Sequence, residues 1–98
     1  MAETVDELTC DWTDESGNQV TKQIEKVVLT KGTWATILYL YQDREAASGE
    51  FGKAKARIQR YQKRGGKYIS QSKFNISSLA QGKQIAETLT AWADAHGE

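Results

Sequence analysis

Apolar and polar residues alternate through the middle of the chain in a way that predicts antiparallel strands. The run 34–41 is rich in aromatic and branched residues and is apolar at both odd and even positions, which is typical of a strand covered on both faces. After Lys53 the odd positions are polar, whereas the even positions begin with Ala54, Ala56 and Ile58. We therefore expect residues 19–76 to form one antiparallel sheet.

A tight reversal at Gly65 and Gly66 predicts a hairpin between the strands on either side of it. Opposed residues of a hairpin lie on one face, so the loop length decides which side chains meet. A two-residue loop would place Arg57 opposite Phe74 and mix the faces. A three-residue loop with a glycine bulge gathers the apolar residues, namely Ala56, Ile58, Phe74 and Ile76. We predict the longer loop, an apolar core face and a basic, tyrosine-bearing outer face.

The spacing of Ile85, Leu89 and Trp92 predicts a C-terminal helix over 78–95 with one apolar stripe. A serine followed three residues later by glutamine forms a capping-box pattern at its start. We expect this helix to pack its stripe on one face of the sheet. Trp34 and Trp92 are then core residues.

Residues 1–18 leave two interpretations open. They are acidic and weakly patterned, and the stretch 14–18 has strong turn chemistry. They form either an acidic N-terminal arm or a first hairpin, in which 7–12 pairs with 19–29. The expected fold is thus a single α+β domain over 1–98, with a curved four- to five-stranded antiparallel meander and one C-terminal helix.

The charge of the chain is strongly polarised, although its net value is zero. Residues 1–50 carry ten acidic residues against four basic ones, and residues 51–98 carry nine basic residues against three acidic ones. Between 53 and 73 there are eight cations and no acidic residue: Lys53, Lys55, Arg57, Arg60, Lys63, Arg64, Lys67 and Lys73. Such a field indicates a charged partner.

Catalysis and metal binding have little support in the composition. The chain has one histidine, His96, near its end and one cysteine, Cys10. These cannot build a zinc site in one copy of the chain. We expect no enzymatic activity, no metal and no cofactor. The chain lacks an apolar run of membrane-spanning length and a secretory signal, which favours a soluble cytoplasmic protein without a membrane partner.

Cations interleaved with aromatic residues favour binding of single-stranded nucleic acid. Tyr61, Tyr68 and Phe74 lie among the basic residues, and such sets neutralise phosphates and stack on unpaired bases. We favour DNA over RNA. Two alternatives stay open: an acidic protein partner, including the chain's own N-terminal half or that of a second copy, and simple solvation.

From Gly52 onward the chain resembles the single-stranded-DNA-binding fold of the transcriptional coactivator positive cofactor four, whose relatives include the plant Whirly proteins. The matching pieces are 52–53, 57–61, the turn 65–66, and 73–77 before the helix. The chain departs from that pattern at Phe74 and Asn75, in the first helical turn, and in its longer acidic N-terminus. The resemblance implies a curved four-stranded sheet with one helix, single-stranded DNA as partner, and a homodimer.

The resemblance also implies that certain residues lie on or beside the binding surface: Lys53, Lys55, Arg57, Arg60, Tyr61 and Lys73. Alternation along the strand gives nearly the same set and adds Lys63, but it points Arg60 to the opposite face. The direction of Arg60 is therefore open. Arg64 and Lys67 lie at the tip of the hairpin and complete the predicted binding residues.

Overall fold

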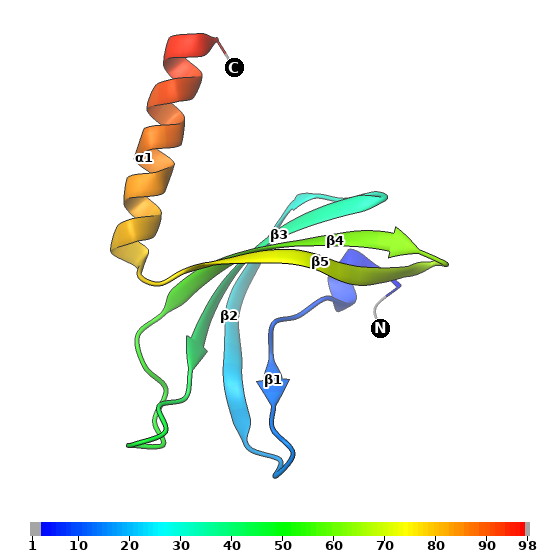
Figure 1. Ribbon diagram of the computed structural model, residues 1–98, viewed down its shortest axis with the longest axis vertical. Helices are drawn as coiled ribbons and strands as arrows, with labels where there is room; N and C mark the ends of the chain where they lie inside the picture. Colours follow the sequence, from blue (N-terminus) through cyan, green and yellow to red (C-terminus); the bar gives the residue numbers. More distant parts are fainter. Residues whose placement is uncertain (1–2, 98) are drawn as a thin grey trace.

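The computed structural model describes residues 3–97 and contains one sheet and one long helix (Figure 1). In chain order the elements are the 3-10 helix η1 (Val5–Glu7), β1 (Trp12–Thr13), β2 (Gln19–Thr30), β3 (Trp34–Asp43), β4 (Lys55–Arg64), β5 (Lys67–Ile76) and α1 (Leu79–His96). In this part of the chain, no helix has both the length and the apolar character needed to cross a membrane.

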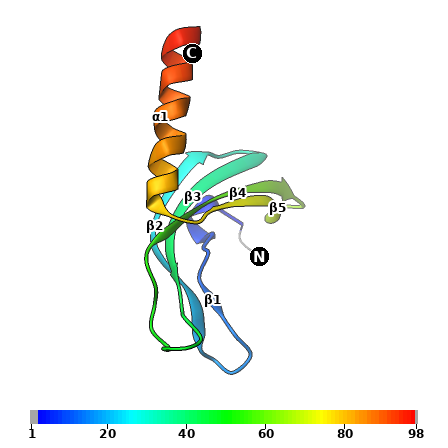
Figure 2. The same ribbon diagram turned by 60° about the vertical axis from the view of Figure 1, so that its left-hand side comes forward.

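The five strands form a curled antiparallel meander in the order β1-β2-β3-β4-β5 (Figure 2). This confirms the predicted α+β architecture. Of the two interpretations of the N-terminus, the first hairpin forms, although it is shorter than expected. Trp12 pairs with Thr21, and the backbone of Asp14 hydrogen-bonds that of Asn18 and Gly17 to close the turn. Strand β1 is thus two residues long.

The hairpin of β4 and β5 has the predicted apolar register but not the predicted loop. Ile58 lies opposite Phe74, as expected. Arg64, however, pairs with Lys67, so the loop has only the two glycines, and the predicted three-residue loop is wrong.

A bulge inside β5 reconciles the short loop with that register. Arg60 pairs with Ser72 and Tyr61 pairs with Ser70, which leaves Gln71 as the extra residue. A bulge shifts the parity of one strand by one residue and increases the local twist. The chain therefore corrects its register in mid-strand, where the alternation pattern gave no sign of it.

One face of the sheet, here called the tyrosine face, carries the buried core. It is defined by Ala35, Ile37, Tyr39 and Tyr41 of β3, which are at most 2% exposed, together with the side chains paired with them. Strand neighbours place Tyr61 on the same face, since Ala35 pairs with it. Lys55, Arg57 and Lys63 of β4 therefore share their face with the core, and the predicted separation into a core face and a basic outer face is wrong.

The N-terminal segment covers part of the tyrosine face. Leu8 and Cys10 are buried against the tyrosines. Lys26 of β2 fixes this segment, because its Nζ donates hydrogen bonds to the carbonyl oxygens of Val5, Asp6 and Leu8 at 2.6, 3.2 and 2.7 Å. One ammonium group thus satisfies three backbone acceptors of a segment that has little regular structure.

The opposite face, here called the apolar face, has no comparable cover. It is defined by Val27, Leu38, Ile58 and Phe74, which are paired in turn across β2 to β5, and by Leu40, which pairs with Ala56. Val27 and Phe74 are more than half exposed.

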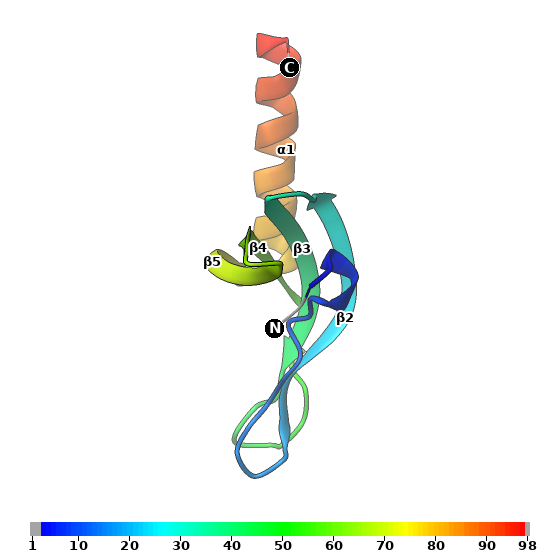
Figure 3. The same cartoon turned by 90° about the vertical axis from the view of Figure 1, so that its right-hand side faces the viewer.

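Helix α1 projects away from the sheet instead of packing on it (Figure 3), so the expected packing is wrong. None of its residues is buried. Trp92 is 61% exposed and Trp34 is 41% exposed, which also overturns their assignment to the core. The caps were predicted correctly: the Ser78 hydroxyl accepts a hydrogen bond from the Gln81 N–H, and a left-handed glycine ends the helix.

Candidate nucleic-acid interface

Pleating divides the predicted cations between the two faces of the β4–β5 hairpin. Lys55, Arg57 and Lys63 follow the odd positions of β4 on the tyrosine face, and Lys73 joins them through its pairing with Gln59. The remaining strand cations lie on the apolar side or at its rim, namely Arg60, Arg64 and Lys67. Lys53 precedes β4.

Tyr61 shares the tyrosine face but cannot stack on a base in this structure. It is 4% exposed, and its hydroxyl hydrogen-bonds that of Tyr39 at 2.8 Å. Burial raises the pKa of both hydroxyl groups. Alternation placed Tyr61 on the correct face. It could not show that the N-terminal segment covers the part of that face where Tyr61 lies.

Arg60 lies on the apolar side, as strand alternation indicated. Its guanidinium carbon sits 4.6 Å from the centre of the Trp34 ring, within the range of a cation–π contact. The position implied by the resemblance is therefore not the one that this side chain adopts.

A cavity of about 400 Å³ opens on the tyrosine face beside the N-terminal segment. Its lining combines cations, polar groups and one aromatic ring: Thr9, Cys10, Trp12, Thr21, Arg57, Gln59 and Lys73. Trp12 is 59% exposed, which leaves much of its side chain accessible. The volume lies in the range of small-molecule sites, about 300–1,000 Å³.

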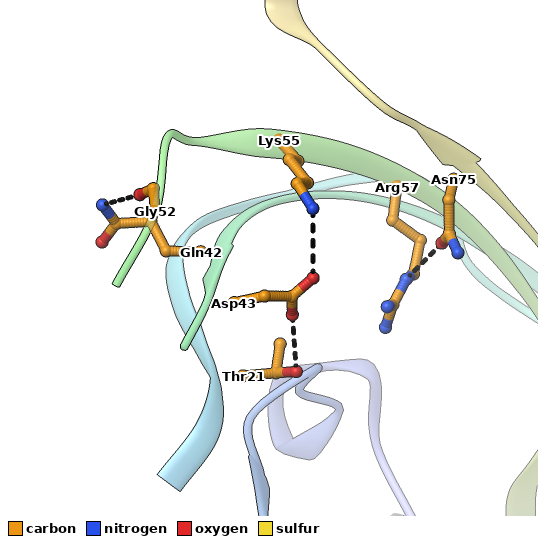
Figure 4. A network of polar contacts seen from close by, with 7 residues as sticks. All are labelled: Thr21, Gln42, Asp43, Gly52, Lys55, Arg57 and Asn75. Carbon is orange, nitrogen blue, oxygen red and sulfur yellow. Dashed lines mark hydrogen bonds and ion pairs between the residues drawn. The ribbon is translucent and has the colours of Figure 1, made fainter. Parts of the chain in front are cut away.

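Arg57 is held rigidly at this cavity. Its Nε donates to Asn75 Oδ1 at 2.8 Å (Figure 4), and its guanidinium lies 4.6 Å from the centre of the Tyr41 ring. These contacts leave the terminal nitrogen atoms for another partner. A planar guanidinium with two fixed sides is well suited to bind a phosphate.

Gln59 adds an acceptor without a partner at the same site. Its Nε2 donates to Ser70 Oγ at 2.9 Å, whereas its Oε1 is buried and has no hydrogen-bond partner within residues 3–97. A buried acceptor without a partner is costly and is a reason to look for a missing ligand or solvent molecule.

Lys55 belongs to a structural network more than to the cavity. Its Nζ lies 3.5 Å from Asp43 Oδ2, and Asp43 Oδ1 accepts a hydrogen bond from the Thr21 hydroxyl at 2.9 Å (Figure 4). Both charged side chains are 40% exposed, so solvent screens this pair.

Among the described residues, Lys55 is the only one of the eight cations within salt-bridge distance of a carboxylate. The acidic N-terminal segment lies on the same face, but its carboxylates have other partners. Asp11 accepts hydrogen bonds from the Gln23 N–H and the Gln19 side chain, and Glu7 accepts from the N–H groups of Glu3 and Thr4. Apart from the pair between Asp43 and Lys55, the carboxylates named here therefore do not neutralise the cations of the hairpin.

Of the seven residues that line this cavity, sequence reasoning named Arg57 and Lys73 as binding residues, and it missed Trp12 and Gln59 among the others. It left Trp12 undecided between a core and a binding role, and it treated Gln59 as one polar residue of the basic face. The short alternation around Trp12 was the one available signal, since it places Trp12 and Cys10 on the same side of an extended segment.

Within residues 3–97, no group of three or more His, Cys, Asp or Glu side chains is placed to hold a metal ion. Cys10 is a buried free thiol, and burial raises its pKa. Comparison of the chain with protein-family models, with curated proteins and with solved structures gives no match.

Proposed function

We propose that this protein binds single-stranded nucleic acid, DNA in preference to RNA, on its tyrosine face and without enzymatic activity. The convergence of Arg57, Lys73 and Trp12 on one cavity supports this proposal most strongly. Phosphate binding needs cations free of carboxylate partners, and base stacking needs an exposed aromatic ring. The lining of this cavity contains both kinds of group.

Each side chain has a separate role in this proposal. Arg57 and Lys73 neutralise backbone phosphates, and Lys63 extends the basic track toward the hairpin tip. Trp12 stacks on a base, the role first predicted for Tyr61. The oxygen of Gln59 suits a base amino group once its amide turns toward the cavity. A single strand can turn its bases outward to reach these groups, whereas a duplex keeps them stacked.

The resemblance to positive cofactor four supports the same class of partner, because the matched pieces include the strand that carries Arg57. The single buried cysteine fits a reducing compartment, and we place the activity in the cytoplasm.

Fluorescence anisotropy with a labelled oligodeoxythymidine of about 20 nucleotides tests the proposal, because one binding fold covers roughly 4–16 nucleotides. The test variant is R57Q/K73Q. The matched control, R64Q/K67Q, removes the same two charges from the apolar side of the same hairpin. We expect the first variant to bind much more weakly than the control. Equal losses in both variants would refute a site on the tyrosine face.

Salt dependence gives a second readout in the same assay. If Arg57, Lys63 and Lys73 all contact phosphates, the slope of log K against log salt should be about −2, at roughly −0.7 per contact for a single strand. The R57Q/K73Q variant should reduce this slope by about 1.4. An affinity that does not change with salt would contradict the proposal.

An acidic protein partner is the alternative for the same surface. It gains no support from the chain's own acidic segment, whose carboxylates make local contacts instead. Competition distinguishes the two: unlabelled single-stranded DNA should displace the probe at far lower concentration than an acidic peptide of equal charge. Duplex DNA and RNA competitors then rank the nucleic-acid classes.

A further inference from the structure

Among residues 3–97, one buried side-chain polar atom lacks a hydrogen-bond partner, and it is the Oε1 atom of Gln59. Gln59 lies in the middle of β4, opposite Ile37 of β3 and Lys73 of β5. Its side chain lines the cavity between the N-terminal segment and the β4–β5 hairpin. Because buried acceptors are normally satisfied, this atom indicates that the cavity takes a molecule with a hydrogen-bond donor.

A bulge in β5 anchors the nitrogen of the Gln59 amide. Tyr61 pairs with Ser70, whereas a ladder without the bulge would place Gln71 at that position. The bulge thus brings the Ser70 hydroxyl to the tyrosine face, where it accepts a hydrogen bond from Gln59 Nε2 at 2.9 Å. Bulges often re-aim side chains next to binding sites. Here the sheet uses the amide nitrogen, and the amide oxygen remains for a ligand.

The hydroxyl groups of the cavity do not supply the missing donor. The Thr9 hydroxyl donates to Gln23 Oε1 at 2.8 Å. The Thr21 hydroxyl donates to Asp43 Oδ1 at 2.9 Å. A hydroxyl group has one hydrogen to donate, so both are already used. The two cations of the lining are the phosphate sites of the proposed function, which leaves the ligand itself as the source of the donor.

We propose that the cavity selects a nucleotide whose base carries an exocyclic amino group, namely cytosine, adenine or guanine, and that Gln59 is the residue that recognises it. This inference rests on the proposed function, in which Arg57 and Lys73 hold the phosphate. The amino group of the base donates to Gln59 Oε1. The terminal torsion of a glutamine side chain is broad, so the amide turns toward the cavity at little conformational cost.

Thymine and uracil are disfavoured because they present a carbonyl oxygen where cytosine has its amino group. Two acceptors then face each other, and Gln59 Oε1 stays without a partner. A site built to hydrogen-bond one group rejects an analogue that lacks it, since a buried polar group is left unpaired. Phosphate contacts carry no sequence information, and stacking on Trp12 accepts any base. Gln59 is therefore the specificity-determining residue of the cavity.

Two labelled oligonucleotides of about 20 nucleotides test this inference in the anisotropy assay. Oligodeoxycytidine and oligodeoxyuridine have the same length, charge and ring size, and they differ in the amino or carbonyl group at one ring position. A mildly alkaline buffer keeps cytosine unprotonated and the strand unpaired. We expect the wild-type protein to bind oligodeoxycytidine about tenfold more tightly, which corresponds to one hydrogen bond to a buried acceptor.

Three variants assign this preference to Gln59. Q59M keeps the length of the side chain and removes the acceptor, so both oligonucleotides should bind with equal affinity. Q59E retains an acceptor and should retain the preference, at a lower overall affinity because of its negative charge. The matched control Q62M makes the same substitution on the apolar side of β4, opposite Trp34, and should keep the tenfold ratio. Circular dichroism checks that all three variants fold.

The outcomes separate this inference from the proposed function. Equal binding of both oligonucleotides by the wild-type protein, or a preference that Q59M retains, would overturn the inference. So would a preference for oligodeoxyuridine, which would mean that the amide nitrogen faces the cavity. In each case, salt-dependent binding that R57Q/K73Q loses would still support the proposed function. Failure of the wild-type protein to bind either oligonucleotide would overturn both.

Discussion

The hydroxyl groups of Tyr39 and Tyr61 hydrogen-bond each other at 2.8 Å inside the core of the tyrosine face. The pair joins the central strand β3 to β4, under the N-terminal segment. Each hydroxyl is the partner that the other needs, because an unpaired buried hydroxyl carries a desolvation cost. The tyrosine predicted to bind bases is thus half of a structural pair.

Removing both hydroxyl groups of this pair should destabilise the protein by less than the sum of the two single removals. We expect Y39F and Y61F each to lower the free energy of unfolding by about 1–3 kcal/mol, since each leaves its partner unsatisfied. The double variant should lose less than the sum. Urea unfolding of the four proteins as a double-mutant cycle measures the coupling, and additive losses would show that the two hydroxyls are independent.

Alkaline pH should destabilise the fold through the same pair. Burial raises the pKa of Tyr39 and of Tyr61 above the ordinary value of about 10. Above pH 10 the unfolded chain therefore releases protons that the folded chain retains, so stability is complete below pH 10 and falls as the pH rises. Denaturation followed between pH 8 and 12 should show this loss, and Y39F/Y61F should show a smaller one. Equal slopes in both proteins would exclude the pair as the cause.

Lys26 should control access to the covered part of the tyrosine face. In a K26M variant the carbonyl groups of Val5, Asp6 and Leu8 lose their shared donor. Hydrogen bonds to a charged group contribute about 1.5–3 kcal/mol each, so we expect the buried Cys10 thiol to react at least about tenfold faster with a disulfide reagent. The control K22M, on the same strand, should leave the rate near that of wild type.

Two glycine-to-alanine substitutions should act in opposite directions. Gly82 lies inside α1, and a Cβ atom there would make only ordinary contact with Ile76, so G82A should stabilise the protein by about 1 kcal/mol. Gly66 has a φ of 81° in the hairpin loop, where alanine is strained and should cost about 1 kcal/mol or more. Thermal unfolding should move by roughly 4–8 °C per kcal/mol in each direction. A drop in melting temperature for G82A would mean that Ile76 cannot accommodate the added methyl group.

Trp12 should contribute to nucleic-acid affinity, whereas Trp34 should not. Stacking of one base is worth about 1–3 kcal/mol, so W12A should weaken binding of single-stranded DNA by about 5- to 150-fold. Trp34 lies on the apolar side under Arg60, and W34A serves as the control in the same anisotropy assay. Unchanged affinity of W12A would remove Trp12 from the site.

Much of the architecture could be predicted because it depends on local patterns. The period-two alternation predicted the strands, the glycine pair marked the reversal between β4 and β5, and the spacing of Ile85, Leu89 and Trp92 predicted the helix. Even the opposition of Ile58 and Phe74 followed from parity alone. The bulge at Gln71 did not, because a single extra residue inside a polar strand changes no local signal.

The sequence by itself determined which residues share a face, including the basic ladder of Lys55, Arg57 and Lys63. Only the tertiary structure decided which face is buried and what covers it. A strand pattern defines two sides, but burial depends on segments distant in sequence, here the N-terminal segment held by Lys26 and the helix that turns away after Ile76. For that reason Tyr61 belongs to the core, and Trp12 is the exposed aromatic residue that lines the cavity.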